Sequence, residues 1–188
     1  RGLFVPKYPV LACNHCITQV DIQGQRMFLD PTSQDYRFPY FRSDDHGILA
    51  FNFIEGERYT IPVPPGMEAF GKIAHDSMHL RAQGELVVES SNKYTGSYEA
   101  GLRAGWKRVP DNLQLQVMQQ YLNTIAPGAK LKADDMSPPE DLEKQFTLEY
   151  KYSLPDYAAK AGPFKLIAFP DQHRAFPGES VTNLQNPL

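Results

Sequence analysis

A histidine and an aspartate stand on two neighbouring strand-like segments early in the chain. His15 lies at the start of the first segment and Asp30 at the end of the second, with the turn sequence Gln23-Gly24 between them. A carboxylate that orients an imidazole is the arrangement by which histidine serves as a general base toward a nucleophile. The two residues therefore indicate proton-transfer chemistry, provided that the hairpin brings both side chains to one face.

The register of the hairpin decides whether that condition holds. With a two-residue turn, Asp30 lies opposite Ile17 and Thr32 lies opposite His15. His15 and Asp30 are then diagonal neighbours on one face, roughly 7–8 Å apart at the backbone, which is within reach of long side chains. A three-residue turn would separate them.

A second interpretation needs no chemistry. His15 would be a half-buried strand histidine, and Asp30 would close a turn with Pro31, because Leu-Asp-Pro-Thr is a reasonable turn sequence. Spacing alone leaves both interpretations open.

Two cysteines, Cys13 and Cys16, flank the histidine. Their spacing suggests a redox or zinc motif, but no second pair completes a four-ligand zinc site, and the strand-like sequence that follows lacks the helix N-terminus of redox motifs. A metal site that joins His15 to these cysteines, His75 or His79 has little support. We therefore predict ordinary, partly buried thiols, with no metal and no cofactor.

Short strands and turns dominate the predicted secondary structure, since the chain holds 16 prolines and 13 glycines. Strands are expected at 14–22, 25–30 and 47–53, followed by a proline-rich extended connector from 59 to 65. This connector is the predicted boundary between a first domain, residues 1–65, and a second domain, residues 66–188.

The second domain is predicted to be an antiparallel sheet with a helical pair packed on it, so that the whole chain is α+β and mainly antiparallel β. A hairpin is expected over 72–90, with its turn at Gln83-Gly84. Helices are expected at about 96–108 and 112–126, the second capped by Asp111. Further strands are predicted at 130–133, 146–154 and 164–169; residues 146, 148, 150 and 152 alternate with period two.

Charge and hydropathy exclude several classes of function. The net charge of −3 with a pI near 6.0 offers no basic field for nucleic acid. No apolar run is long enough to span a bilayer, so direct membrane insertion is not expected. The chain opens without a methionine in strand-like sequence, and we expect it to be a fragment of a longer protein.

A resemblance to a known family rests on three stretches. Asn-His-Cys-Ile at 14–17, Met-Phe-Leu-Asp-Pro-Thr at 27–32 and Asp-His-Gly at 45–47 resemble the end of the catalytic core of bacterial transglutaminase-like cysteine enzymes. That superfamily has a papain-like fold and a Cys–His–Asp triad in this chain order. The later segments 94–103 and 146–154 resemble the β-rich C-terminal domain of its bacterial members.

The resemblance implies roles for two residues. His15 would be the general base and Asp30 its orienting carboxylate, acting on a peptide or protein amide through hydrolysis or acyl transfer. The family nucleophile begins a helix well before the histidine, so Cys13 and Cys16 cannot replace it, and this chain alone should be inactive. The family also suggests a periplasmic or cell-envelope location.

A binding function is the alternative. The loop at 36–41 carries Tyr36, Phe38, Tyr40 and Phe41, and exposed rings there would suit a protein or cell-envelope partner on a non-catalytic scaffold. Exposure of these rings would distinguish the two functions. Oligomeric state is not indicated. The remaining histidines, His46 and His173, stand in polar loops and are expected to be solvated.

Overall fold

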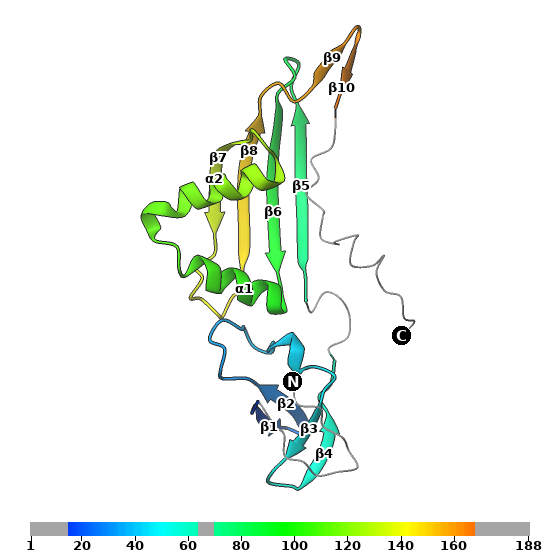
Figure 1. The fold of residues 1–188 in the computed structure, drawn as a ribbon, viewed down its shortest axis with the longest axis vertical. Helices are drawn as coiled ribbons and strands as arrows, with labels where there is room; N and C mark the ends of the chain where they lie inside the picture. The colour runs from blue at the N-terminus through cyan, green and yellow to red at the C-terminus, as the bar shows by residue number, and fades with distance from the viewer. Residues whose placement is uncertain (1–14, 64–69, 168–188) are drawn as a thin grey trace. The chain divides into compact units, whose positions relative to one another are not determined.

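The computed structural model describes residues 15–63 and 70–167, and these form an α+β structure whose strands pair mainly antiparallel, as predicted (Figure 1). They divide into two compact units. Among the described residues, one unit holds 15–63, 70–75, 91–108 and 136–148, and the other holds 76–90, 109–135 and 149–167. The boundary expected near residue 65 stays a prediction, because it adjoins residues 64–69, which lie outside the described part.

The first hairpin has the predicted register. Strand β1 (Thr18–Ile22) pairs antiparallel with β2 (Gln25–Leu29), with Thr18 opposite Leu29 and Ile22 opposite Gln25. Gln23 and Gly24 have φ values of 52° and 78°, as a two-residue type I′ turn requires. The first strand begins later than the predicted residue 14, so His15 lies just before it.

A second hairpin and a small apolar core complete the N-terminal part. The 3₁₀ helix η1 (Ser43–Asp45) precedes β3 (Leu49–Asn52), which pairs with β4 (Glu57–Thr60). The predicted connector at 59–65 is wrong for its first two residues, because backbone pairing with β3 places them in β4. Phe28, Phe41 and Ile61 form the buried core of this region.

Four strands form the larger sheet, in the order β5-β6-β8-β7 (Figure 1). The predicted hairpin is confirmed as β5 (Lys72–Leu80) and β6 (Leu86–Tyr94), although β6 extends four residues beyond the expected end. Strands β7 (Lys130–Met136) and β8 (Thr147–Leu154) follow. The predicted period of two is confirmed, since residues 146, 148, 150 and 152 are all buried.

The strand predicted at 164–169 is shorter and has a partner that was not predicted. Strand β10 (Phe164–Leu166) pairs antiparallel with β9 (Ala159–Ala161) in a small hairpin. The sequence from 155 to 163 contains turn formers on both sides of a three-residue strand, which is too short for a periodic pattern to indicate.

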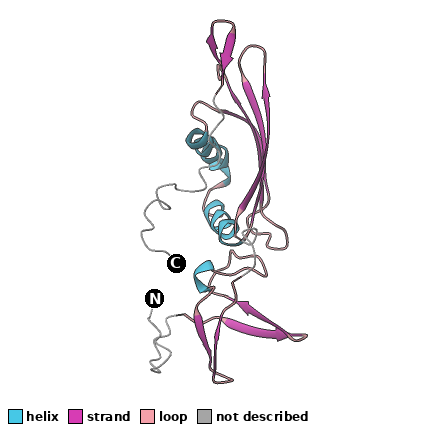
Figure 2. Ribbon diagram, turned by 90° about the vertical axis from the view of Figure 1, so that its right-hand side faces the viewer, coloured by secondary structure: helices cyan, strands magenta, loops and turns pink. Residues whose placement is uncertain are grey.

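Helix α2 (Gln114–Ile125) buries its apolar stripe against the strands of its own unit (Figure 2). Met118 and Leu122 are fully buried, and the ring of Tyr121 meets that of Tyr150 edge-on at 6.2 Å between centroids. The predicted cap was wrong. Asp111 begins a 3₁₀ turn, η3 (Asp111–Leu113), and accepts a hydrogen bond from the Gln114 side chain instead of a backbone amide.

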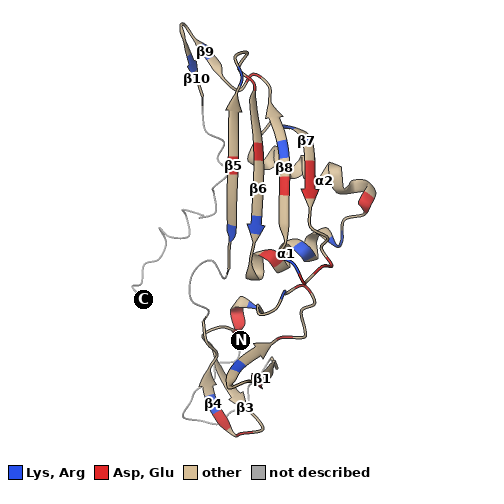
Figure 3. Cartoon of the chain, turned by 180° about the vertical axis from the view of Figure 1, so that it is seen from behind, with Lys and Arg blue, Asp and Glu red and all other residues tan. Residues whose placement is uncertain are grey.

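Helix α1 (Gly96–Trp106) carries neighbouring acidic and basic residues (Figure 3). Glu99 and Arg103 lie one turn apart and are 2% and 0% exposed. Arg103 donates to Glu99 at 2.8 Å, and Arg37 from the loop before η1 donates to the same carboxylate at 3.1 Å. A buried Arg–Glu–Arg cluster therefore ties α1 to the loop that carries the predicted aromatic residues. Among the described helices, none is long and apolar enough to cross a membrane.

Candidate functional site

The turn after β2 presents the carboxylate of Asp30. Pro31 ends the strand because it lacks an amide proton for the ladder. Thr32 then folds back, and its backbone N and side-chain Oγ1 donate to Asp30 Oδ1 at 3.0 and 2.7 Å. This is the local hydrogen bonding for which Asp is favoured in turns. One carboxylate oxygen is thus fully engaged, and Oδ2 is left for another partner.

That partner is His15. Its Nε2 lies 3.1 Å from Asp30 Oδ2, and the two side chains are 28% and 1% exposed. The predicted meeting of these residues on one side of the hairpin is therefore confirmed; their catalytic role stays a prediction. Since Nε2 faces the carboxylate, the proton of a neutral imidazole belongs on Nε2, and Nδ1 is the nitrogen left for chemistry.

A third residue of the site was not predicted. Asp45, the last residue of η1, places Oδ2 3.5 Å from the same Nε2 of His15. Its side chain is 8% exposed, and the guanidinium of Arg42 approaches its Oδ2 to 3.9 Å. The sequence offered one signal, an acid directly before His46-Gly47, but no spacing rule relates residue 45 to residue 15.

The two carboxyl groups are shifted in opposite directions. Burial by itself raises the pKa of Asp30, but its hydrogen bonds with Thr32 and His15 and its attraction to His15 outweigh burial, so that this pKa lies below the usual 3.8. Burial also raises the pKa of Asp45; His15 and Arg42 oppose the rise, the neighbouring carboxylates add to it, and the result lies above 3.8. Hydrogen bonds therefore stabilise the ionised form of Asp30, whereas the cost of burying the charge of Asp45 is only partly offset by its neighbours.

We expect Asp45→Asn to raise the thermal unfolding midpoint at neutral pH. A raised folded-state pKa contributes stability below the unfolded-state pKa, and this contribution is lost as pH rises through the folded-state pKa. The asparagine removes the cost of ionising Asp45 in the folded state, so the gain over wild type should shrink toward zero near pH 3, below the usual value of 3.8. Thermal unfolding followed by circular dichroism across this pH range measures it.

Asp30→Asn is the matched comparison, and its thermal unfolding midpoint should change in the opposite direction. The lowered pKa of Asp30 stabilises the fold above its unfolded-state pKa, and this contribution is lost as pH falls through the folded-state pKa. The variant should therefore unfold at a lower temperature than wild type at neutral pH, with the deficit closing on acidification. A lower midpoint for Asp45→Asn at neutral pH would contradict the assignment.

The other histidines and cysteines lie apart from this cluster or outside the described residues. Cys16 is exposed, which corrects the expected partial burial, and Cys13 lies outside the described residues. His75 and His79 are exposed on β5 and do not join His15 in any cluster of possible metal ligands within the described ranges. His173 also lies outside the described residues.

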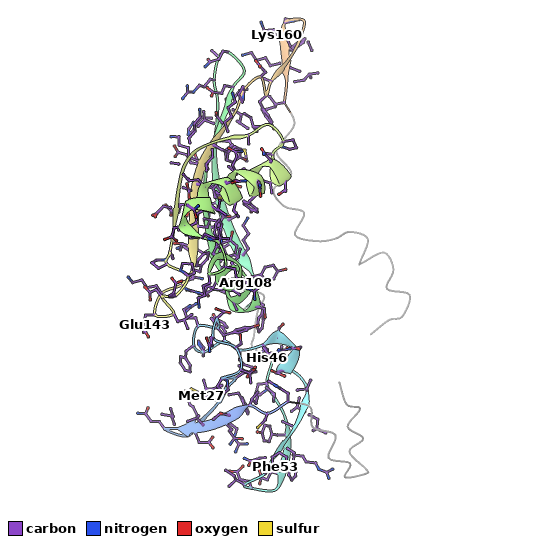
Figure 4. All side chains as sticks on the ribbon, turned by 60° about the vertical axis from the view of Figure 1, so that its left-hand side comes forward. Met27, His46, Phe53, Arg108, Glu143 and Lys160 are labelled. Atoms are coloured by element: carbon purple, nitrogen blue, oxygen red, sulfur yellow. The ribbon has the colours of Figure 1, made fainter. Side chains whose placement is uncertain are left out.

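His46, labelled in Figure 4, is half-buried and packs against aromatic rings, which corrects the expected solvation. Its ring packs on that of Phe41 at 4.1 Å between centroids and meets Phe70 edge-on at 5.2 Å. Its Nδ1 lies 2.8 Å from the carbonyl oxygen of Pro62, to which it can donate, and its Nε2 is buried. The residue after Asp45 is therefore held by aromatic packing, which also fixes the end of η1.

The aromatic loop mostly packs on its own unit. Phe38 is 60% exposed, whereas Phe41 is 6% exposed and belongs to the small core. The hydroxyl of Tyr36 donates to Ser97 at 3.1 Å, and Arg37 lies over the ring of Tyr40. One exposed ring among four does not favour a binding surface here, and a partner at this loop stays a prediction.

No family model, curated protein or solved structure matches the chain. An imidazole with one nitrogen held by a buried carboxylate and the other nitrogen available can accept a proton at Nδ1 and later return it. A thiol or hydroxyl placed beside Nδ1 would be activated as a nucleophile.

Proposed function

We propose that His15 and Asp30 are the general base and the orienting carboxylate of a transglutaminase-like cysteine enzyme that transfers the acyl group of a peptide or protein amide. The observation that carries the proposal is the 3.1 Å contact of His15 Nε2 with Asp30 Oδ2. The nucleophilic thiolate would come from a segment outside the described residues, beginning a helix whose N-terminus stabilises it.

The support of Asp30 favours an orienting role over that of a simple turn residue. A turn aspartate needs only the two hydrogen bonds from Thr32, and both fall on Oδ1. Oδ2 is nevertheless buried and directed at the imidazole. A carboxylate held on one oxygen and bonded to histidine through the other fixes both the tautomer and the plane of the ring, as an orienting acid must.

The exposure of His15 suits a base that must meet a partner. Its side chain is 28% exposed, while the carboxylate behind it is 1% exposed. The buried side of the ring is therefore occupied by the orienter, and the accessible side can face a thiol. Cys16 cannot be that thiol, because it is the next residue along an extended segment and no helix N-terminus lies there.

The reaction balances with these groups alone. The thiol proton moves to His15 Nδ1, and the thiolate sulfur attacks the amide carbonyl carbon. The C–N bond then breaks as Nδ1 returns the proton to the departing amine, leaving a thioester. Water or an amine then gives a proton to Nδ1 and attacks the thioester carbon, the C–S bond breaks, and Nδ1 returns the proton to the sulfur. Water yields the acid and an amine yields a new amide, so both peptidase and transamidase outcomes use the same base.

The tautomer of His15 tests this proposal. Long-range ¹H–¹⁵N correlation spectra of the chain, recorded where the imidazole is neutral, should show the proton of His15 on Nε2. In Asp30→Asn the spectrum should shift toward a mixture of tautomers, because the amide can either accept or donate. The exposed His79 is the control, and its tautomer should not respond. A proton on Nδ1 in the wild type would defeat the proposal.

A further inference from the structure

Three possible metal ligands converge on one point at the candidate site. The ligand atoms of His15, Asp30 and Asp45 all lie within 4.8 Å of one another. The distances from His15 Nε2 to the two Oδ2 atoms are 3.1 and 3.5 Å. Zinc bonds of about 2.0–2.1 Å in a tetrahedron place neighbouring ligand atoms about 3.3–3.4 Å apart, so the observed distances lie on either side of the value that a bound ion would impose.

A buried carboxylate oxygen that accepts no hydrogen bond from the described residues points into this cluster. This atom is Asp45 Oδ2. His15 Nε2 has a single proton to donate, and Asp30 lies closer to it. A buried carboxylate oxygen without a donor is costly, and a cation held between the three side chains would remove that cost.

The local charge also favours a cation. Two buried carboxylates face one imidazole, and the nearest guanidinium, that of Arg42, is engaged mainly by Asp44 at 2.6 Å and lies 3.9 Å from Asp45. With His15 neutral, as a metal ligand must be, the cluster carries two negative charges against this one shared positive charge.

We propose that His15 Nε2, Asp30 Oδ2 and Asp45 Oδ2 bind one divalent ion of the zinc class, with water in the fourth position on the exposed side of the imidazole. Thr32 orients the Asp30 ligand, because its two hydrogen bonds hold Asp30 Oδ1 and leave Oδ2 for the metal. Binding does not rest on the proposed acyl transfer. If that function also holds, the ion occupies His15 Nε2, so the proton of the neutral ring moves to Nδ1 and the base is blocked.

Zinc titration by isothermal calorimetry, at neutral pH on the whole chain, tests the site. A Cys13→Ser/Cys16→Ser background removes the thiols that could bind zinc separately. One equivalent should bind in this background, and Asp45→Asn should weaken the affinity at least tenfold. Asp134→Asn is the control, since Asp134 is an exposed carboxylate on β7, outside the unit that holds Arg42, and the zinc affinity of this variant should stay within about twofold of the background.

A second measurement keeps His15, Asp30 and Asp45 unsubstituted, so it does not depend on variants of the site that fold poorly. Addition of Co²⁺ to the same background should broaden the ring signals of His15 well before those of His79, because paramagnetic broadening falls steeply with distance. Zinc affinity that is unchanged in Asp45→Asn, loss of all binding in the cysteine-free background, or equal broadening of both histidines would each overturn the proposal. If zinc binds but does not inhibit an active enzyme, the metal site stands and only the proposed inhibition of acyl transfer is overturned.

Discussion

His15→Ala should lower turnover of an amide substrate by about 10⁴–10⁶-fold if the proposed acyl transfer holds, measured in an active form that also contains a nucleophilic cysteine. Without an imidazole at this position, the thiol has no group to take its proton and the leaving amine has none to supply one. The loss should fall on kcat, because no uniform binding interaction is removed. Steady-state kinetics with a peptide amide measure it, with circular dichroism to verify that the variant is folded.

Asp30→Ala should be less severe, at about 10³–10⁴-fold, because the imidazole is still present but its tautomer and orientation are no longer held. The exposed β5 residue His79 provides the control, and His79→Ala should leave turnover unchanged. Residues 1–188 alone should show no thiol-dependent turnover. Wild-type rates in both site variants would leave the His15–Asp30 contact as a purely structural one.

Arg103→Met should destabilise the fold by about 3–5 kcal/mol, since it removes one partner of a buried ion pair. The guanidinium of Arg103 is fully buried and donates to Glu99 and to the carbonyl oxygens of Pro138, Pro139 and Lys144. Methionine has a similar length but no donor, so the three carbonyl oxygens lose these hydrogen bonds, while Glu99 keeps those from Arg37 and the Phe146 amide. Urea unfolding, read as the change in midpoint at constant slope, gives the free energy.

The chain offers a matched control for this variant. Arg81 and Glu85 form an ion pair with the same spacing as Arg103 and Glu99, but their side chains are 58% and 22% exposed. Arg81→Met should change the free energy of unfolding far less, because solvent already screens that pair. Should the Arg103→Met variant be too unstable to purify, Arg103→Lys keeps the charge, loses the forked donors and should fall between. Equal effects at both arginines would contradict a stabilising role for the buried cluster.

Prediction from sequence worked where a local rule applied. The dipeptide Gln23-Gly24 specifies a two-residue turn through its positive φ values, and the turn sets the register of everything paired beyond it. The proximity of His15 and Asp30 follows from that register. Strand β8 could be predicted equally well, because alternation of large apolar side chains depends only on which face of the strand is buried.

Prediction failed where a short element depends on distant partners. Residues 57–60 pair with β3 although a proline-rich sequence begins at Pro62, and Asp111 bonds to the Gln114 side chain although it stands where a cap was expected. No local sequence pattern indicates either of these two contacts. Each was decided by contacts that compete with the local preference.

The amino-acid sequence by itself determined the hairpin, its register and hence the pairing of an imidazole with one carboxylate, because residues 15 and 30 are linked by a turn whose geometry is local. Only the tertiary structure brought Asp45 to the same nitrogen, packed His46 on Phe41 and buried Glu99 between two arginines. The contacts of Asp45 with His15 and of Arg37 with Glu99 join segments that no helix or strand period relates, so their energy exists only once the segments have packed together.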